Sequence, residues 1–287
     1  MASLGKSLTY ALLALLSALP SYAALPCLGD ADASERYTVY LIPRLPSTQL
    51  FENWGPLLRR VGAESGLCFD LVIPQSFDAF ETAMMKGKPD FSYLNPYHQV
   101  MVHETQGYIP LVRNRTASLA GIIVVPQESG IRELKQLDGK TVAFPSPNAY
   151  VASLITRAKL AQEGIAITPL YVGSHSNVYR AVVRDMAAAG GGANTTFGRE
   201  PETLRNRLRL LYTSEFYTPH PFSAHPRVPE AVQERVRRSF LKLHDDPEGA
   251  AMLKAIQMPE PVGADYRRDY KVLESLRLER FVTRRRE

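Results

Sequence analysis

Short β-rich segments alternate with amphipathic helical segments along most of this 287-residue chain. Strands are predicted at 36–42, 68–73, 90–94, 108–112, 119–125, 142–144, 167–172, 187–193 and 208–213. Helices are predicted at 47–66, 76–87, 149–163, 175–186, 229–243, 247–256 and 264–276, with one more beginning at Pro96. Because strands separated by helices of this length pair in parallel, the alternation predicts an α/β fold in which mainly parallel sheets are flanked by helices.

Two irregular segments interrupt this alternation. Residues 113–118 are polar (RNRTAS), and residues 214–226 are rich in proline (SEFYTPHPFSAHP). Segments of this composition typically connect domains. The sequence therefore predicts two lobes joined by a two-strand hinge, with residues 24–115 plus 220–287 in lobe 1 and residues 116–219 in lobe 2.

The N-terminus has the pattern of an export signal. Lys6 is followed by an apolar run from Leu8 to Leu19, and Ser21-Tyr22-Ala23 fits a small-x-small cleavage site. The apolar run is shorter than the roughly 20 residues that a membrane-spanning helix needs. We therefore expect residues 1–23 to be a cleaved signal peptide and the protein to reside in the periplasm; an uncleaved anchor is the alternative.

The chain has two cysteines, Cys27 and Cys68. In an oxidising compartment a single disulfide between them is expected, which would attach the start of the exported chain to the end of the first helix. By loop entropy such a bridge stabilises the fold by about 4 kcal/mol. Two buried free thiols are the alternative.

Charge and motif spacing exclude several functions. The formal charge is +5, and since Lys6 is the only charged residue of the signal, the remainder carries 5 − 1 = +4, which agrees with an anionic ligand. We find no nucleic-acid-binding motif, no zinc spacing, no G-x-S-x-G nucleophile and no cofactor motif; Gly190-Gly191-Gly192 lacks the lysine of a phosphate-binding loop. The sequence thus predicts neither catalytic residues nor a metal site.

The candidate ligand site lies in the loops that follow four predicted strands. Ligands of α/β proteins bind beyond the carboxyl ends of the strands, where helix N-termini offer free N–H groups to anions. The loops follow Ile42, Leu94, Phe144 and Val172. They supply the candidate ligand-binding residues Tyr93, Asn95, Ser146, Asn148, Ala149, Tyr150, Ser174, His175 and Ser176. For each loop the alternative is ordinary helix capping.

Four segments form motifs in a fixed order. They read PDFSYLNP at 89–96, GIIVVP at 121–126, LDGKTVAF at 137–144 and GSHS at 173–176. In these motifs the chain resembles the phosphate/phosphite/phosphonate-binding proteins of ABC transporters, which are type 2 periplasmic binding proteins. The resemblance covers roughly residues 36–245. It implies the two-lobe type 2 fold, and Tyr93 and His175 match family positions that contact the ligand.

The chain departs from the family pattern at two places. Where the family has a run of small hydroxyl residues that grips an oxyanion, this chain reads Ala149-Tyr150-Val151-Ala152. Where the family has an acidic residue that binds an amino or hydroxyl group, it reads Ala187-Ala188-Ala189-Gly190. These departures mark a divergent branch and argue against an aminophosphonate ligand.

The resemblance implies a monomeric binding protein that closes on a small oxyanion and delivers it to an ABC permease in the inner membrane. The alternative is a sensory input protein for a histidine kinase, which the residues do not distinguish from transport. A third hypothesis is an enzyme on the same scaffold, for which His175 is the one candidate general base. No cofactor and no nucleic-acid partner are expected.

Overall fold

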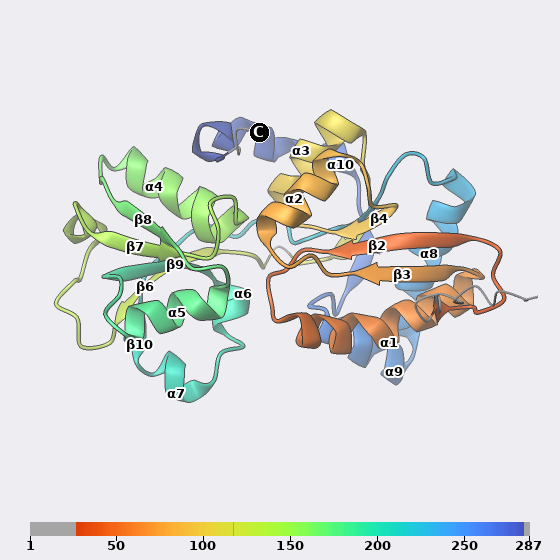
Figure 1. Ribbon diagram of the computed structural model, residues 1–287, viewed down its shortest axis with the longest axis horizontal. Helices are drawn as coiled ribbons and strands as arrows, with labels where there is room; N and C mark the ends of the chain where they lie inside the picture. Colours follow the sequence, from red (N-terminus) through yellow and green to blue (C-terminus); the bar gives the residue numbers. More distant parts are fainter. Residues whose placement is uncertain (1–26, 117, 284–287) are drawn as a thin grey trace, which may run out of the picture.

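Two β-sheets, each covered by helices, lie side by side in the computed structural model (Figure 1). The structure describes residues 27–116 and 118–283. The expected signal peptide, residues 1–23, lies outside this part of the chain. Among the described residues, no helix is both long and apolar enough to cross a membrane.

The larger sheet has seven strands in the order β1-β3-β2-β4-β11-β5-β12, and we call the body around it the large lobe. Its strands are β1 (Leu28–Gly29), β2 (Arg36–Leu41), β3 (Cys68–Val72), β4 (Phe91–Tyr93), β5 (Ile109–Asn114), β11 (Phe222–Ala224) and β12 (Pro261–Gly263). Its helices are α1 (Ser47–Ser65), α2 (Phe77–Met85), α3 (Pro96–Gln106), α8 (Glu230–Lys242) and α9 (Pro247–Ala255), and a 3-10 turn η3 (Leu243–Asp245) links the last two.

The smaller sheet has five strands in the order β10-β6-β9-β7-β8, and we call the body around it the small lobe. Its strands are β6 (Gly121–Pro126), β7 (Thr141–Phe144), β8 (Thr168–Tyr171), β9 (Ala189–Ala193) and β10 (Leu208–Thr213). Its helical elements are the 3-10 turn η1 (Leu134–Leu137), the π-helix η2 (Tyr150–Ile155), α4 (Thr156–Gln162), α5 (His175–Val183), α6 (Asn194–Phe197) and α7 (Glu202–Arg205).

The two-lobe α/β fold is confirmed, but the sheets are mixed and not mainly parallel. Three adjacent strands of each sheet are parallel: β3, β2 and β4 in the large lobe, and β8, β7 and β9 in the small lobe. The strands by which the chain leaves or enters a lobe, β5, β6, β10 and β11, pair antiparallel. Two consecutive strands pair in parallel only when a crossover connection, usually a helix, returns the chain to the same sheet. At these four strands the chain instead crosses from one lobe to the other, so they pair antiparallel.

The glycine-rich strand β9 explains how the small lobe packs. A Cβ atom on Gly191 would lie 2.3 Å from the carbonyl oxygen of Ala152 and 2.5 Å from the Phe144 ring. A Cβ atom on Gly121 in β6 would lie 2.4 Å from the carbonyl oxygen of Val151. Glycine therefore lets the backbone of η2 approach the sheet directly, which sets the position of the helix start that follows β7.

Two chain segments join the lobes. They are residues 115–120, between β5 and β6, and residues 214–221, between β10 and β11. They touch through reciprocal backbone hydrogen bonds between Leu119 and Tyr217. The predicted pair of hinge strands therefore corresponds to two segments that contact one another.

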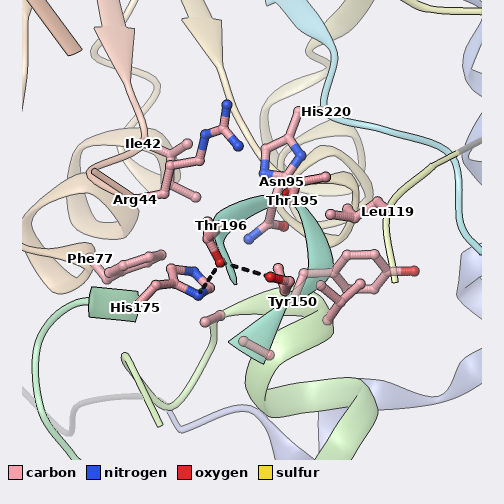
Figure 2. A pocket seen from close by; sticks show the side chains of 14 residues that line it. Ile42, Arg44, Phe77, Asn95, Leu119, Tyr150, His175, Thr195, Thr196 and His220 are labelled. Atoms are coloured by element: carbon pink, nitrogen blue, oxygen red, sulfur yellow. Dashed lines mark hydrogen bonds between the residues drawn. The ribbon is translucent and has the colours of Figure 1, made fainter. Parts of the chain in front are cut away.

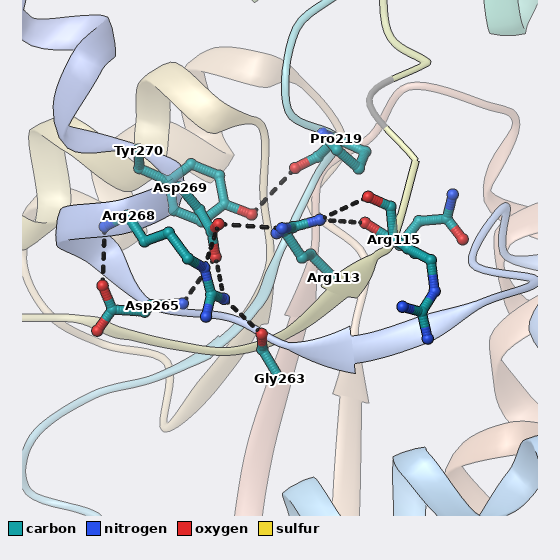
Figure 3. A network of polar contacts seen from close by, with 9 residues as sticks. Arg113, Arg115, Pro219, Gly263, Asp265, Arg268, Asp269 and Tyr270 are labelled. Atoms are coloured by element: carbon teal, nitrogen blue, oxygen red, sulfur yellow. Dashed lines mark hydrogen bonds and ion pairs between the residues drawn. The ribbon is translucent and has the colours of Figure 1, made fainter.

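The C-terminal segment contacts one hinge segment at Pro219 and the end of β5, directly before the other (Figure 3). Tyr270 donates its hydroxyl to the carbonyl of Pro219 at 3.1 Å, and Arg113 at the end of β5 pairs with the buried Asp269 at 3.0 Å. Burial alone would raise the pKa of Asp269, but hydrogen bonds from Arg268 and Arg113 hold it at about 2. The segment is thus attached to the hinge by an ionised carboxylate and a buried phenol.

The single helix predicted at 264–276 is wrong. The structure has a short helix α10 (Tyr266–Asp269) followed by two 3-10 turns, η4 (Lys271–Leu276) and η5 (Leu278–Phe281). Tyr270 leaves helical geometry with φ −124° because its buried ring and bonded hydroxyl are held against the hinge. Arg277 then adopts a left-handed conformation with φ 46°, which separates the two turns.

A disulfide joins Cys27 to Cys68, whose Cα atoms are 5.4 Å apart. It attaches the segment before β1 to the start of β3, so it lies in the large lobe, far along the sheet from the hinge (Figure 1). The large lobe's core surrounds Trp54, Phe91 and Phe222, whose rings contact one another.

Candidate ligand-binding site

A small cavity lies between the two lobes, beside the hinge (Figure 2). Its volume is about 30 Å³, roughly two to three times the minimum that one water molecule occupies. The large lobe lines it with Ile42, Arg44, Phe77 and Asn95, the hinge with Leu119 and His220, and the small lobe with Ala149, Tyr150, Val151, Ala152, His175, Ala193, Thr195 and Thr196. In this closed arrangement the cavity admits only a ligand of a few heavy atoms.

The lining residues sit where strands end and helices begin. Arg44 follows β2, and Asn95 follows β4 as the cap of α3, accepting from the His98 N–H at 2.7 Å. His175 is the first residue of α5, and Thr195 lies in the first turn of α6, directly after β9. The N-terminal groups of helices carry partial positive charge and free N–H donors. Elements of both lobes therefore present donors to the same space.

Arg44 supplies the cavity's positive charge. Arg44 is only 5% exposed. Its guanidinium lies over the Tyr93 ring, 5.3 Å from the ring centroid, and its Nη2 donates to the Tyr93 hydroxyl at 3.4 Å. Its Nη1 donates to the side-chain oxygen of Gln257. Within the described part of the chain, Arg44 forms no ion pair with a carboxylate, and its buried Nε has no hydrogen-bond partner. A buried cation without an anion is costly, which indicates that an anion belongs beside it.

A second arginine is close to the first. Burial, followed by repulsion from Arg44, lowers the pKa of Arg199. Arg199 belongs to the small lobe and donates to the carbonyl of Ala255 in the large lobe at 2.9 Å. The electrostatic coupling between the two guanidinium groups means that closing the lobes concentrates positive charge near the cavity.

Two further polar atoms facing the cavity are unsatisfied. The Asn95 side-chain nitrogen and the Thr195 hydroxyl are buried and, among the described residues, have no partner. Because the Asn95 oxygen is occupied by its cap bond, the nitrogen is free to donate. Together with Arg44 Nε and the buried Tyr150 hydroxyl, they make four unused donors among the described cavity-lining residues, two from each lobe.

Both cavity histidines are neutral at neutral pH. Burial, and next the positive charge of Arg44, lowers the pKa of His175 to about 3. The same two causes, in that order, lower the pKa of His220 well below its usual range. His175 Nδ1 is 3.2 Å from the Thr196 hydroxyl, as Figure 2 shows. The histidines therefore act as neutral hydrogen-bonding groups, and the charge of the cavity comes from arginine.

Four of the nine predicted site residues line the cavity: Asn95, Ala149, Tyr150 and His175. Tyr150 forms a wall, because its ring stacks on Tyr97 at 6.4 Å and contacts the Tyr217 ring at 5.6 Å. Burial raises its pKa well above the usual value, so the phenol stays protonated.

The other five predicted residues make different contacts. Tyr93 lies beneath Arg44, and Ser146 is buried, with no hydrogen-bond partner for its hydroxyl in the described part of the chain. Asn148 donates to Glu81 and to the Thr283 carbonyl. Ser174 caps α5, and Ser176 donates to Glu200. A direct role of these five in ligand binding stays a prediction.

The sequence analysis missed Arg44, Thr195, Thr196 and His220. A signal for Arg44 was available: it stands in the loop after Ile42, one of the four selected loops, in the segment Pro43-Arg44-Leu45-Pro46. The two threonines follow the glycine-rich strand directly. His220 lies in a segment that was predicted to be only a hinge. Among residues 27–116 and 118–283, no cluster of His, Cys, Asp and Glu side chains could hold a metal ion.

Two lobes on a two-segment hinge, with a small cavity between them that holds a few polar groups in a mostly apolar lining, are the arrangement of a type 2 solute-binding protein. The family described as the periplasmic substrate-binding protein of phosphonate ABC transporters matches residues 39–270, and the chain belongs to this family. The resemblance predicted from the four sequence motifs is therefore confirmed.

Individual relatives agree with this assignment. The phosphate-import protein PhnD of Mycolicibacterium smegmatis is 21% identical over 234 residues, which cover 72% of this chain and 71% of that protein. The Prochlorococcus marinus protein PhnD1, solved in complex with methylphosphonate, has a TM-score of 0.78 at 15% identity, covering 86% and 99% of the two chains. A phosphonate-transporter binding protein from Pseudomonas aeruginosa has a TM-score of 0.75 at 15% identity, covering 86% of each chain.

Proposed function

We propose that this chain captures a small oxyanion of the phosphate, phosphite or alkylphosphonate type between its lobes and presents it to an ABC permease. The observation that carries the proposal is Arg44, a buried guanidinium with an unpartnered Nε at the cavity and no carboxylate partner in the described residues. An oxyanion supplies both the missing charge and several acceptors for the unused donors.

The size and lining of the cavity support a small ligand. Its small volume, about 30 Å³, favours a ligand of few heavy atoms, and the P. marinus relative was solved with such a ligand, methylphosphonate. Ile42, Phe77 and Leu119 add apolar walls beside Arg44, so a compact anion with one apolar substituent fits better than a larger, fully polar solute.

Binding without chemical conversion is part of the proposal. The described cavity lining contains no carboxylate, and His175 is held neutral with Nδ1 next to Thr196. Because the matching family consists of transport components, we propose uptake and not the sensory alternative.

The lobe limits, export and oligomeric state complete the proposal. We propose residues 24–115 plus 220–287 and residues 116–219 as the two lobes, cleavage after Ala23, a periplasmic location and a monomer. Intact-mass measurement of the protein isolated from the periplasm tests export and cleavage. Size-exclusion chromatography with light scattering tests whether the protein is a monomer. A mature chain that still carries residues 1–23, or a stable dimer, contradicts the corresponding part.

A thermal-shift panel tests the ligand class. Phosphate, phosphite, methylphosphonate, sulfate and arsenite are each added to the ligand-free protein. At 100-fold excess over Kd, a bound ligand stabilises the fold by about 2.7 kcal/mol, so at least one anion should raise Tm clearly. No shift with any oxyanion, together with a clear shift by an uncharged metabolite, contradicts the proposal.

A further inference from the structure

One side-chain amide connects the two lobes next to the cavity. Gln257, directly after α9 in the large lobe, accepts a hydrogen bond from Arg44 Nη1 and donates from Nε2 to the Thr195 carbonyl at 3.2 Å. Thr195 belongs to the small lobe. Both partners line the cavity, and each carries a buried donor, Nε of Arg44 or the hydroxyl of Thr195, that has no hydrogen-bond partner among the described residues. Gln257 therefore joins two residues, one from each lobe, that each carry an unsatisfied donor.

The chemistry of the partners determines the orientation of this amide. A guanidinium has only donors and a backbone carbonyl has only acceptors. The Gln257 oxygen must therefore face Arg44 and its nitrogen must face Thr195. Glutamate has the same shape, but its ionised carboxylate cannot donate to Thr195, and its charge would neutralise Arg44.

The backbone at Gln257 indicates that its side chain has a use. The α9 helix ends with a hydrogen bond from the Gln257 N–H to the Lys254 carbonyl at 3.1 Å and one from the Met258 N–H to the Leu253 carbonyl at 2.8 Å. Gln257 takes the left-handed position of this ending, with φ 66°. That position favours glycine, yet this chain places there a residue whose amide has two partners.

We propose that Gln257 is a positioning residue that determines selectivity for anions: its neutral amide orients Arg44 without cancelling the arginine's charge, and joins Arg44 to Thr195 when the lobes close. The inference rests on the proposed function, because the charge that Gln257 preserves is the charge that binds the oxyanion. A carboxylate at this place would compete with the ligand for Arg44.

The test compares Gln257→Glu and Gln257→Gly with wild type by calorimetric titration of methylphosphonate. Gln127→Glu is the control, since Gln127 is exposed on the small lobe away from the cavity lining. We expect Gln257→Glu to weaken binding at least about tenfold near neutral pH, Gln257→Gly to weaken it less, and the control to stay within about twofold. Gln257→Gly should not lower Tm, because glycine relieves the left-handed backbone.

A pH profile separates this role from a structural one. The Kd ratio of Gln257→Glu to wild type should fall toward one on acidification, because a protonated glutamate donates as glutamine does. The ionisable groups near this amide or the cavity are present in both proteins: Arg44, Arg199, Tyr93, Tyr150, His175 and His220. Their titration is therefore common to both Kd values, and the ratio reports mainly the new carboxyl group.

Small-angle scattering without ligand gives an independent readout. Gln257→Glu should have a larger radius of gyration than wild type, because its carboxylate faces the Thr195 carbonyl and opens the lobes. If wild type binds no oxyanion but Gln257→Glu opens, the proposed function fails while the joining role of Gln257 stands. If Gln257→Glu binds methylphosphonate as tightly as wild type does, the inference is overturned. It is also overturned if Gln257→Glu has both the affinity and the radius of gyration of wild type.

Discussion

The two lobes contribute chemically different halves of the cavity. The large lobe brings a full positive charge, Arg44, on a loop that Tyr93 and Gln257 hold by direct contact. The small lobe lines the cavity with neutral groups: the helix start at Ala149–Ala152, the hydroxyls of Thr195 and Thr196, and a histidine whose pKa is about 3. The large lobe therefore supplies the charge that would attract an anion, whereas both lobes supply hydrogen-bond donors.

The lobes also differ in how they are stabilised. The large lobe has a disulfide and a single extensive core. The small lobe has two smaller apolar clusters, one on each face of its sheet, and relies on close backbone packing at Gly121 and Gly191. Each lobe should therefore be destabilised by a different kind of substitution: loss of the disulfide in the large lobe, and overpacking at glycine in the small lobe.

Removal of the disulfide should produce the largest change in stability. Replacing Cys27 and Cys68 by serine releases a loop with a sequence separation of 41 residues, and by loop entropy the free energy of unfolding should fall by about 4 kcal/mol. Because the bridge lies in the large lobe away from the cavity, ligand affinity below Tm should be unchanged. Urea unfolding followed by circular dichroism measures the loss; an unchanged midpoint would contradict it.

Removal of the Arg44 charge should produce the largest change in affinity. Arg44→Gln keeps hydrogen-bonding capacity but deletes the cation, so we expect oxyanion affinity to fall about 100-fold, equivalent to about 2.7 kcal/mol. Calorimetry measures the change. Arg59→Gln is the matched control, because Arg59 is exposed on the same lobe. Equal affinities for the two variants would show that the large lobe does not supply the attraction.

A methyl group on β9 should destabilise the small lobe alone. Gly191→Ala places a Cβ atom 2.3 Å from the Ala152 carbonyl oxygen, and we expect a loss of about 2–3 kcal/mol from overpacking. Gly130→Ala is the control in the same lobe, since no atom lies within 4 Å of its Cβ position. Hydrogen exchange should show faster exchange in β6 and β9, with the large lobe unchanged. Uniform exchange changes in both lobes would contradict separate packing.

Acidification should open the ligand-free protein. The closed form holds the pKa of His175 at about 3, whereas an exposed histidine has about 6.5. The closed form is therefore fully stable above about pH 6.5 and becomes progressively less stable as the pH falls toward 3. At pH 5 it is destabilised, relative to the open form, by roughly 2 kcal/mol. Small-angle scattering should show the opening, and His175→Gln should reduce it. A radius of gyration independent of pH would contradict this prediction.

The contacts of Asn148 should have the smallest effect. Its amide joins the small lobe to Glu81 on α2 and to Thr283 in the C-terminal segment. Asn148→Ala should therefore loosen closure and reduce ligand affinity by less than about tenfold, as measured by calorimetry. A loss as large as that of Arg44→Gln would restore Asn148 as a direct ligand contact.

Much of the fold could be predicted because its signals are local. Residues 68–73 and 142–144 were recognised as strands from their apolar runs. Asn95 and Ser174, which lie in two of the four selected loops, accept the hydrogen bonds of ordinary helix caps. These features depend on neighbouring residues alone, so the sequence displays them directly.

The site could be predicted only in part because its decisive contacts are long-range. Asn148 meets Thr283 across 135 positions of sequence, and Arg44 meets Gln257 across 213. A lone arginine after a strand looks like any exposed arginine until the closure of two lobes buries it. The end of helix α10 at Tyr270 likewise depends on a distant contact, the hydrogen bond from the Tyr270 hydroxyl to the Pro219 carbonyl in the hinge.

The most direct test of the account is a crystal structure of the protein grown with methylphosphonate. We expect the phosphonate between the lobes, with its oxygens within hydrogen-bond distance of Arg44 Nε and the Thr195 hydroxyl, and with Gln257 still joining those two residues. A phosphonate bound elsewhere, or between the lobes but without contact to Arg44, would contradict the claim that this arginine provides the attraction for the ligand.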